Sequence, residues 1–163
     1  MTFIKICGIT CVRDALLACE YGADAVGVIV NTPSLRRVST AQAEKIFNSL
    51  PSRVKKVLVN YETNEESLLE TALLLQPDFI QTPHAGLKQF NTMRVLTRFT
   101  DLMKRSDELF LLDLKNHGGV VHRLEFCSEV CQAKEKIILA GGLTPQNVEK
   151  AIQETKPFGV DVC

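Results

Sequence analysis

The chain has 163 residues, about the length of one domain. Its 19 basic residues balance 19 acidic ones, so it lacks the positive excess with which proteins hold nucleic acid through phosphates. No apolar run approaches the ~20 residues of a membrane helix, and the N-terminus lacks the pattern of a signal peptide, so we expect a cytoplasmic protein with neither nucleic-acid nor membrane partners.

Short segments rich in β-branched residues recur along the chain and predict strands. The stretches between them are long enough for a helix, which favours βαβ units over a β-meander. The region 83–108 is the least regular, and it could hold a short strand, 93–96, with broken helix on either side. The predicted strands are 3–7, 25–30, 54–60, 78–81, 93–96, 109–113, 136–140 and 158–162.

Several of the intervening stretches have the boundary signals of amphipathic helices. Ser39 or Thr40 caps one helix and Asn64 caps the next, because a short polar side chain can accept a hydrogen bond from a free N–H of the first turn. Pro145 occupies the first position of a third, where its missing N–H has no cost. The predicted helices are 11–21, 41–50, 65–75 and 145–154.

Strands that alternate with helices predict a parallel sheet, and two architectures satisfy the pattern. One is an open doubly wound sheet and the other is a closed (β/α)8 barrel. Periodicity alone does not choose between them. The chain is short for a closed barrel, which typically takes ~250 residues and rarely fewer than ~200.

Polar residues stand at the carboxyl ends of the predicted strands, where both architectures place their active sites. Lys5 and Cys7 share one face of the first strand, because side chains alternate along a strand. Asp161 faces away from Val160 and Val162 in the last strand. A buried Lys5 needs a partner, and in a closed barrel Asp161 would be within reach because the first and last strands are neighbours.

The histidines and cysteines do not form a metal-binding pattern. His84, His117 and His122 are too scattered to be joint ligands. Cys127 and Cys131 would share one face of a helix, which favours core packing over zinc binding. We therefore expect six reduced thiols and no metal site.

Six short segments, which follow one another along the chain, resemble those of a known family. They are KICGIT (5–10), YGADAVG (21–27), SLRRV (34–38), LLD (111–113), LAGGLTPQNV (139–148) and PFGVDV (157–162). From Lys5 to Val162 the chain resembles phosphoribosylanthranilate isomerase, an enzyme family of tryptophan biosynthesis. The resemblance implies a (β/α)8 barrel forming a single domain over 1–163, with no cofactor and a phosphorylated small molecule as substrate.

The resemblance also implies the chemistry. The family converts N-(5-phosphoribosyl)anthranilate to 1-(2-carboxyphenylamino)-1-deoxyribulose 5-phosphate by an Amadori rearrangement. Asp113 matches the general acid, which must carry its proton when the substrate binds. Cys7 matches the general base, which acts as a thiolate, and a positive charge nearby such as Lys5 favours that form.

Further residues match the parts of the family that bind the substrate. Arg36 matches the residue that holds the anthranilate carboxylate, for which a guanidinium fork is well suited. Gly141 and Gly142 match part of the phosphate site, where glycines let the anion approach N–H groups at a helix start. Asp161 matches the aspartate at the end of the eighth strand. Lys5 and His84 are further candidates for substrate binding, and His84 lies in QTPHAG where the family usually has QLHG.

The chain departs from the family pattern in two larger respects. It ends at Cys163, so the last loop and the eighth helix of the family are expected to be absent, and the segment between strands four and six is shorter. A second copy of the chain or another partner would then cover the exposed strands. These departures keep a second hypothesis open, a catalytically impaired or vestigial paralogue that binds a phosphorylated small molecule or serves a structural role.

Overall fold

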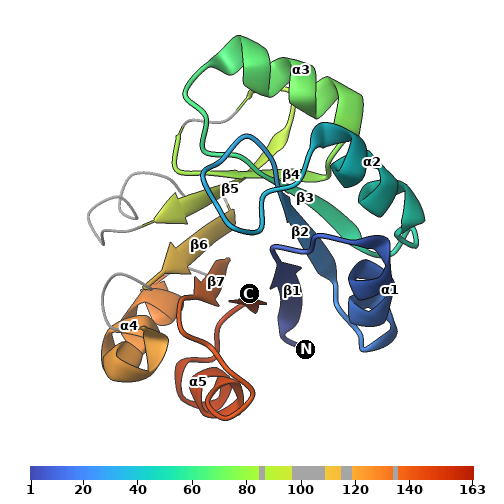
Figure 1. Ribbon diagram of the computed structural model, residues 1–163. Helices are drawn as coiled ribbons and strands as arrows, with labels where there is room; N and C mark the ends of the chain where they lie inside the picture. Colours follow the sequence, from blue (N-terminus) through green and yellow to red (C-terminus); the bar gives the residue numbers. More distant parts are fainter. Residues whose placement is uncertain (85–86, 97–108, 115–118, 134–135) are drawn as a thin grey trace. The chain divides into compact units, whose positions relative to one another are not determined.

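The structure is a computed structural model that describes residues 1–84, 87–96, 109–114, 119–133 and 136–163 (Figure 1). Its strands form a closed barrel in the order β1 to β8, which confirms the barrel and excludes the open sheet. The strands are β1 (Phe3–Cys7), β2 (Ala25–Ile29), β3 (Lys55–Val59), β4 (Phe79–Thr82), β5 (Asn91–Leu96), β6 (Leu109–Asp113), β7 (Ile137–Ala140) and β8 (Gly159–Val162).

Helices follow β1, β2, β3, β6 and β7, in agreement with the predicted alternation, whereas the described residues between β4 and β5 form no helix. The helices of the described residues are α1 (Val12–Glu20), α2 (Thr40–Ser49), α3 (Glu65–Leu75), α4 (Leu124–Ala133) and α5 (Val148–Thr155), with a short 3-10 turn, η3 (Val120–Arg123), before α4. None of these helices has the length and apolar character needed to span a bilayer. The chain divides into two compact units, residues 5–93 and residues 1–4 with 94–163.

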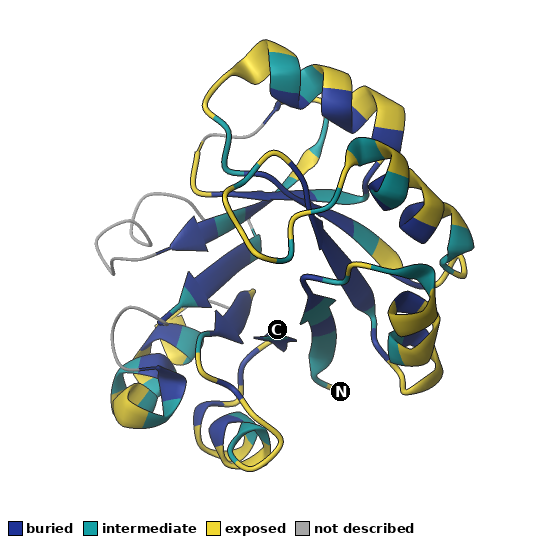
Figure 2. Ribbon diagram, in the orientation of Figure 1, coloured by how far each residue is buried: buried dark blue, intermediate teal, exposed yellow. Residues whose placement is uncertain are grey.

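In the unit of residues 5–93, strands β1 to β4 pair in parallel. Helix α2 packs against both α1 and α3, and the three helices cover one face of β2 and β3. The core beneath them consists of strand residues such as Val28 and Leu58 together with helix residues such as Ile46, Phe47 and Ala72. Figure 2 shows the resulting pattern, with buried strands and helices whose outer sides are exposed.

The caps that start α2 and α3 are those predicted from the sequence. Ser39 accepts a hydrogen bond from the Gln42 N–H at 3.2 Å. Asn64 accepts hydrogen bonds from the N–H groups of Glu66 at 3.0 Å and Ser67 at 3.1 Å. Helix α3 has the predicted bounds, because both its cap and its hydrophobic spacing are local signals.

The unit of residues 1–4 and 94–163 has its own core. Strands β6, β7 and β8 pair in parallel, and α4 and α5 pack on them and on each other. The first residues of β1 join this unit, because the Phe3 N–H donates to the Phe158 carbonyl at 2.9 Å. The two phenylalanine rings also stack, with centroids 5.6 Å apart.

Helix α5 begins at Val148, three residues later than the Pro145 signal predicts, so that prediction was wrong. The reason is the side chain of Asn147. It accepts from the Thr144 N–H at 2.8 Å and donates to the Gly142 carbonyl at 2.9 Å, which stabilises a turn ahead of the helix. Proline in first-turn geometry is compatible with such a turn as well as with a helix.

The connection from β4 to β5 spans residues 83–90, fewer than the dozen or more that a helical crossover takes. Its described residues, 83–84 and 87–90, form no helix. The predicted shortening between the fourth and sixth strands falls partly on 85–86 and 97–108, which lie outside the described residues.

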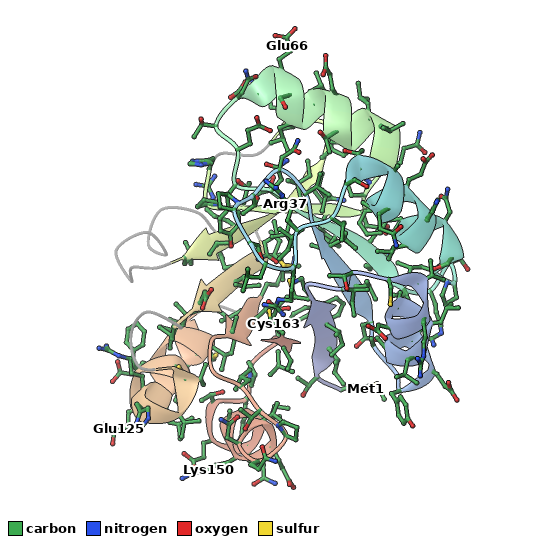
Figure 3. The ribbon with its side chains drawn as sticks, viewed as in Figure 1. Met1, Arg37, Glu66, Glu125, Lys150 and Cys163 are labelled. Atoms are coloured by element: carbon green, nitrogen blue, oxygen red, sulfur yellow. The ribbon has the colours of Figure 1, made fainter. Side chains whose placement is uncertain are left out.

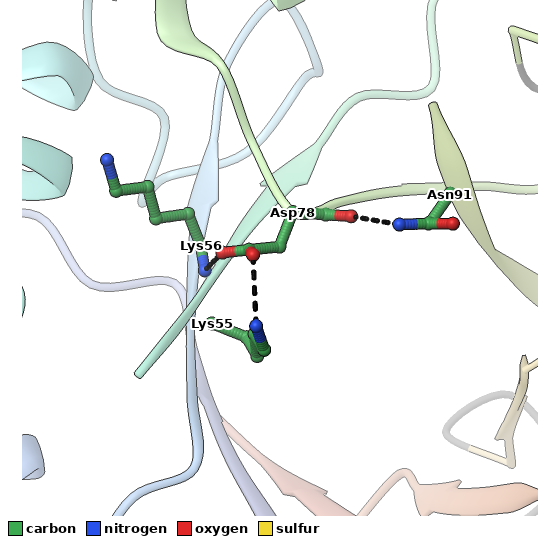
Figure 4. A network of polar contacts seen from close by, with 4 residues as sticks. All are labelled: Lys55, Lys56, Asp78 and Asn91. Carbon is green, nitrogen blue, oxygen red and sulfur yellow. Dashed lines mark hydrogen bonds and ion pairs between the residues drawn. The ribbon is translucent and has the colours of Figure 1, made fainter. Parts of the chain in front are cut away.

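A polar network fixes the first residues of β3, β4 and β5 (Figure 4). The Asp78 carboxylate accepts from the Lys56 N–H at 2.8 Å and from the Lys55 ammonium at 3.2 Å. The Asn91 side chain donates to the Asp78 carbonyl at 3.1 Å. These bonds join the amino-terminal ends of the three strands, at the end of the sheet opposite the candidate site.

Candidate functional site

Lys5 and Cys7 lie on the inner face of β1, as strand alternation predicts, and both are buried. Gly27 stands beside Cys7 on β2. A Cβ atom on residue 27 would lie 2.9 Å from the Cys7 sulfur and 3.2 Å from the Lys5 nitrogen. The thiol and the ammonium therefore converge on the space that this glycine leaves open.

The Arg36 guanidinium is placed against the residue that follows Cys7. It lies over Gly8, whose φ is +75°, and a Cβ there would be 2.8 Å from Arg36 Nη1. Nη1 also donates to the Cys7 carbonyl at 3.4 Å. The structure thus brings three predicted site residues of this unit together: Lys5, Cys7 and Arg36. Arg37, labelled in Figure 3, is exposed on the same loop.

The loop that carries Arg36 is joined to the loop after β3. Asn31, in left-handed conformation with φ of 53°, donates to Glu62 at 3.4 Å. The Glu62 carboxylate also accepts from the Ser67 hydroxyl at 2.9 Å. The Tyr61 N–H donates to the Thr32 hydroxyl at 2.9 Å. These contacts hold Tyr61 at the carboxyl end of β3.

In the second unit, Asp113 and Asp161 occupy matching positions on β6 and β8. Asp113 is in register with Ala140 of β7, and Ala140 is in register with Asp161. The two aspartates are therefore separated by one strand, roughly 10 Å at the usual strand spacing. Asp161 is buried and Asp113 is half-buried. The small side chain of Ala140 leaves room between them.

The predicted phosphate-binding glycines lie in a tight contact between two loops. Gly141 and Gly142 have φ values of 99° and 72°, a region that favours glycine. The Val120 N–H donates to the Gly141 carbonyl at 3.0 Å. A Cβ on Gly119 would lie 3.4 Å from that same carbonyl oxygen, so the loops after β6 and β7 approach closely.

His84 is exposed and lies just after β4, where its N–H donates to the Thr82 hydroxyl at 3.3 Å. Gln81, three residues before it, is instead buried in β4. The sequence contained a signal for Gln81, because it is a polar residue at the end of a predicted strand, but the resemblance attached no role to it.

The cysteines of α4 behave as core residues. Cys127 is fully buried, and burial raises the pKa of its thiol to about 11. Burial, with Cys127 as a further cause, raises the pKa of the Cys131 thiol to about 12. Both thiols stay protonated at neutral pH, in agreement with the predicted packing role.

Comparisons with known proteins agree on one family. A sequence model of the family described as N-(5'phosphoribosyl)anthranilate (PRA) isomerase matches residues 4–163. A relative from Methanoregula boonei named N-(5'-phosphoribosyl)anthranilate isomerase is 40% identical, over 98% of this chain and 84% of the relative. A solved phosphoribosylanthranilate isomerase from Thermotoga maritima superposes with a TM-score of 0.87 at 30% identity, over 99% of this chain and 87% of that one.

A second solved structure of this kind contains a ligand. It is a phosphoribosylanthranilate isomerase in complex with reduced 1-(o-carboxyphenylamino)-1-deoxyribulose 5-phosphate, with a TM-score of 0.79 and 29% identity. It covers 99% of this chain and 87% of that one. The sequence match and the fold agree, and the chain belongs to the phosphoribosylanthranilate isomerase family, enzymes of tryptophan biosynthesis.

Proposed function

We propose that the chain isomerises N-(5-phosphoribosyl)anthranilate to 1-(2-carboxyphenylamino)-1-deoxyribulose 5-phosphate, with Asp113 as general acid and Cys7 as general base. The observation that supports this most directly is the convergence at the end of β1. There the Cys7 sulfur lies beside the Lys5 ammonium, and the Arg36 guanidinium lies over Gly8. A base and an anchor for a carboxylate thus meet at one strand end.

The reaction requires only proton transfers. Asp113 gives a proton to the ring oxygen of the ribose, the C1'–O bond breaks, and the nitrogen lone pair forms the C1'=N bond of an iminium. Cys7, as thiolate, removes the proton from C2', and that electron pair forms the C1'=C2' double bond of the enolamine while the nitrogen regains its lone pair. Tautomerisation to the ketone gives the product, so substrate and product have the same composition.

The charged ends of the substrate have matching partners. Arg36 presents its remaining N–H groups to the anthranilate carboxylate. Gly141 and Gly142 let the phosphate approach the main chain ahead of α5. Asp161 provides a carboxylate for the sugar hydroxyls. The ligand of the solved relative has both a carboxylate and a phosphate, which supports a phosphorylated substrate of this class.

The first test is turnover of N-(5-phosphoribosyl)anthranilate by the purified chain and its variants. Cys7→Ser and Asp113→Asn should each lower kcat by about 10²–10⁴-fold, the usual contribution of a general acid or base. Cys11→Ser, a half-buried cysteine four residues from Cys7, is the matched control and should keep kcat. A Cys7→Ser variant as active as the unaltered chain would contradict the assigned base.

Arg36 is tested by its effect on KM. Arg36→Met should raise KM by about 10- to 100-fold and leave kcat nearly unchanged, because a carboxylate anchor binds substrate and transition state alike. Arg37→Met changes the neighbouring exposed arginine and should leave both constants within about twofold. Equal effects of the two substitutions would exclude Arg36 as the specific anchor.

A further inference from the structure

Gln81 has a buried hydrogen-bond acceptor that no described residue satisfies. The residue is 4% exposed, and no described residue donates a hydrogen bond to Oε1. The other end of the amide is held, because Nε2 donates to the Tyr61 hydroxyl at 3.4 Å. Buried polar atoms are nearly always paired in native proteins, so a buried oxygen left over at a strand end needs an explanation.

Strand alternation shows which way Gln81 faces. Ile80, its neighbour in β4, packs with Leu68 and Ala72 of α3 in the core beneath the helices. Gln81 therefore faces the opposite side, the inner face of the barrel strands. Its partner in register on β3 is Val59, which has no polar side-chain atom to offer. The oxygen thus lies on the inner face near the carboxyl ends of the strands, beside a neighbour that cannot donate to it.

A second buried amide provides a comparison. Asn60 Nδ2 also lacks a partner among the described residues. Its Oδ1, however, accepts from the Glu62 N–H at 2.8 Å, so the amide is committed to the turn after β3. Asn60 comes two residues after Leu58, which packs under the helices, so strand alternation places both on the same face. Of these two residues, only Gln81 lies on the inner face with an acceptor atom, Oε1, that has no donor among the described residues.

We propose that Gln81 is a positioning residue for the substrate, accepting a hydrogen bond from a hydroxyl of its ribosyl group. The inference rests on the proposed function. A carboxamide oxygen cannot bind the carboxylate or the phosphate, since both are acceptors at neutral pH. The anilino N–H of an anthranilate already has the ortho carboxylate as an internal partner, which leaves the sugar hydroxyls as donors. The Tyr61 hydroxyl keeps the amide oriented for this contact.

This role has a thermodynamic signature that a structural glutamine lacks. Replacing Gln81 by an apolar side chain of similar shape removes a buried acceptor without a partner and one long hydrogen bond to the half-buried Tyr61 hydroxyl, so the stability of the free protein should change little. The same replacement removes an acceptor from the complex and weakens ligand binding. A glutamine that supported the fold would show the reverse, with lower stability and unaltered affinity.

The experiment uses Gln81→Met, with Gln153→Met on the exposed side of α5 as the matched control. The probes are the reduced product analogue, which has sugar hydroxyls, and anthranilate, which has none. Calorimetric titration should give about tenfold weaker binding of the analogue to Gln81→Met and unaltered binding of anthranilate. Urea unfolding of the free variant should show stability close to that of the unaltered chain, and Gln153→Met should change neither affinity.

The outcomes separate the two proposals. If the unaltered chain binds the analogue and Gln81→Met binds it equally well, the role of Gln81 is overturned and the proposed function stands. Equal weakening of analogue and anthranilate, or loss of stability in free Gln81→Met, would also overturn it. If the unaltered chain does not bind the analogue, the proposed function itself fails, and the inference with it.

Discussion

Gly27 illustrates how a single residue without a side chain shapes the candidate site. The space above it holds the sulfur of Cys7 and the ammonium of Lys5, both buried. In the proposed mechanism Cys7 acts as a thiolate, a form that a neighbouring positive charge favours. The resemblance drew attention to Cys7 and Lys5, but the reason for a glycine at position 27 appears only when the neighbouring strand is in place.

Gly27→Ala should lower kcat by about 10²-fold, because a reacting group displaced by about 1 Å loses that much. The new methyl carbon would lie 2.9 Å from the Cys7 sulfur, so the thiol has to move. Gly22→Ala is the control. Gly22 has φ of +91° and no atom within 4 Å of a Cβ, so this change should cost about 1 kcal/mol of stability and leave kcat unaltered. Steady-state kinetics gives kcat and urea unfolding gives the stability of both variants. An unaltered kcat in Gly27→Ala would contradict the expected displacement of the thiol.

At the scale of elements, the first residues of β3, β4 and β5 are joined by side-chain hydrogen bonds between the strands and not by helices. The connection from β4 to β5 is short and its described residues form no helix. Asp78 and Asn91 instead link the first residues of β3, β4 and β5 (Figure 4). The Asp78 bond to a main-chain N–H carries more weight than its ion pair with Lys55, because both charged side chains of that pair are substantially exposed.

Asp78→Ala should therefore lower the free energy of unfolding by about 1–2 kcal/mol, since the Lys56 N–H loses its acceptor. Lys55→Met removes only the ion pair and should cost less than about 0.5 kcal/mol. Urea unfolding of the two variants checks the difference. Equal losses would mean that the ion pair, and not the main-chain bond, fixes this end of the strands.

At the scale of the whole molecule, the chain has two separate cores, one in each compact unit. The core of residues 94–163 contains thiols: Cys127 is fully buried and Cys131 packs against the same cluster. Burial raises the pKa of both thiols from 9.0 in the unfolded chain to about 11 and about 12. Stability and pH are linked through this difference.

Between pH 9 and about 11, the unfolded chain has released these two protons while the folded core retains them. The contribution of the thiols to stability is therefore complete below pH 9 and is lost as the pH rises through that range. Chemical unfolding from pH 7 to 11 should show this fall, and the Cys127→Ala/Cys131→Ala variant should show a shallower one. Cys11→Ala/Cys163→Ala, which alters less buried thiols, should retain the slope of the unaltered chain. If the free energy of unfolding falls with pH at the same rate in all three proteins, the buried thiols are not the cause of the fall.

The sequence by itself determined the order of strands and helices and the family. Periodicity and capping are local properties, so β1, β6 and α3 have their predicted bounds and Asn64 caps as expected. The strand-end residues Cys7 and Asp113 could be proposed from the sequence because motifs retain chemistry in short segments. The start of α5 was missed because Asn147 bonds to Gly142, a contact that periodicity does not contain.

Periodicity left the open sheet and the closed barrel both possible, and the resemblance implied the barrel. Only the tertiary structure shows the closure itself, because closure depends on pairing between residues distant in the chain, such as Phe3 and Phe158. It also decided what surrounds each strand end. The convergence over Gly27 needs two strands side by side, and the unsatisfied oxygen of Gln81 emerges only when every neighbouring donor has a position. Hydrogen bonding of buried groups is a property of the three-dimensional neighbourhood, which no single segment of sequence specifies.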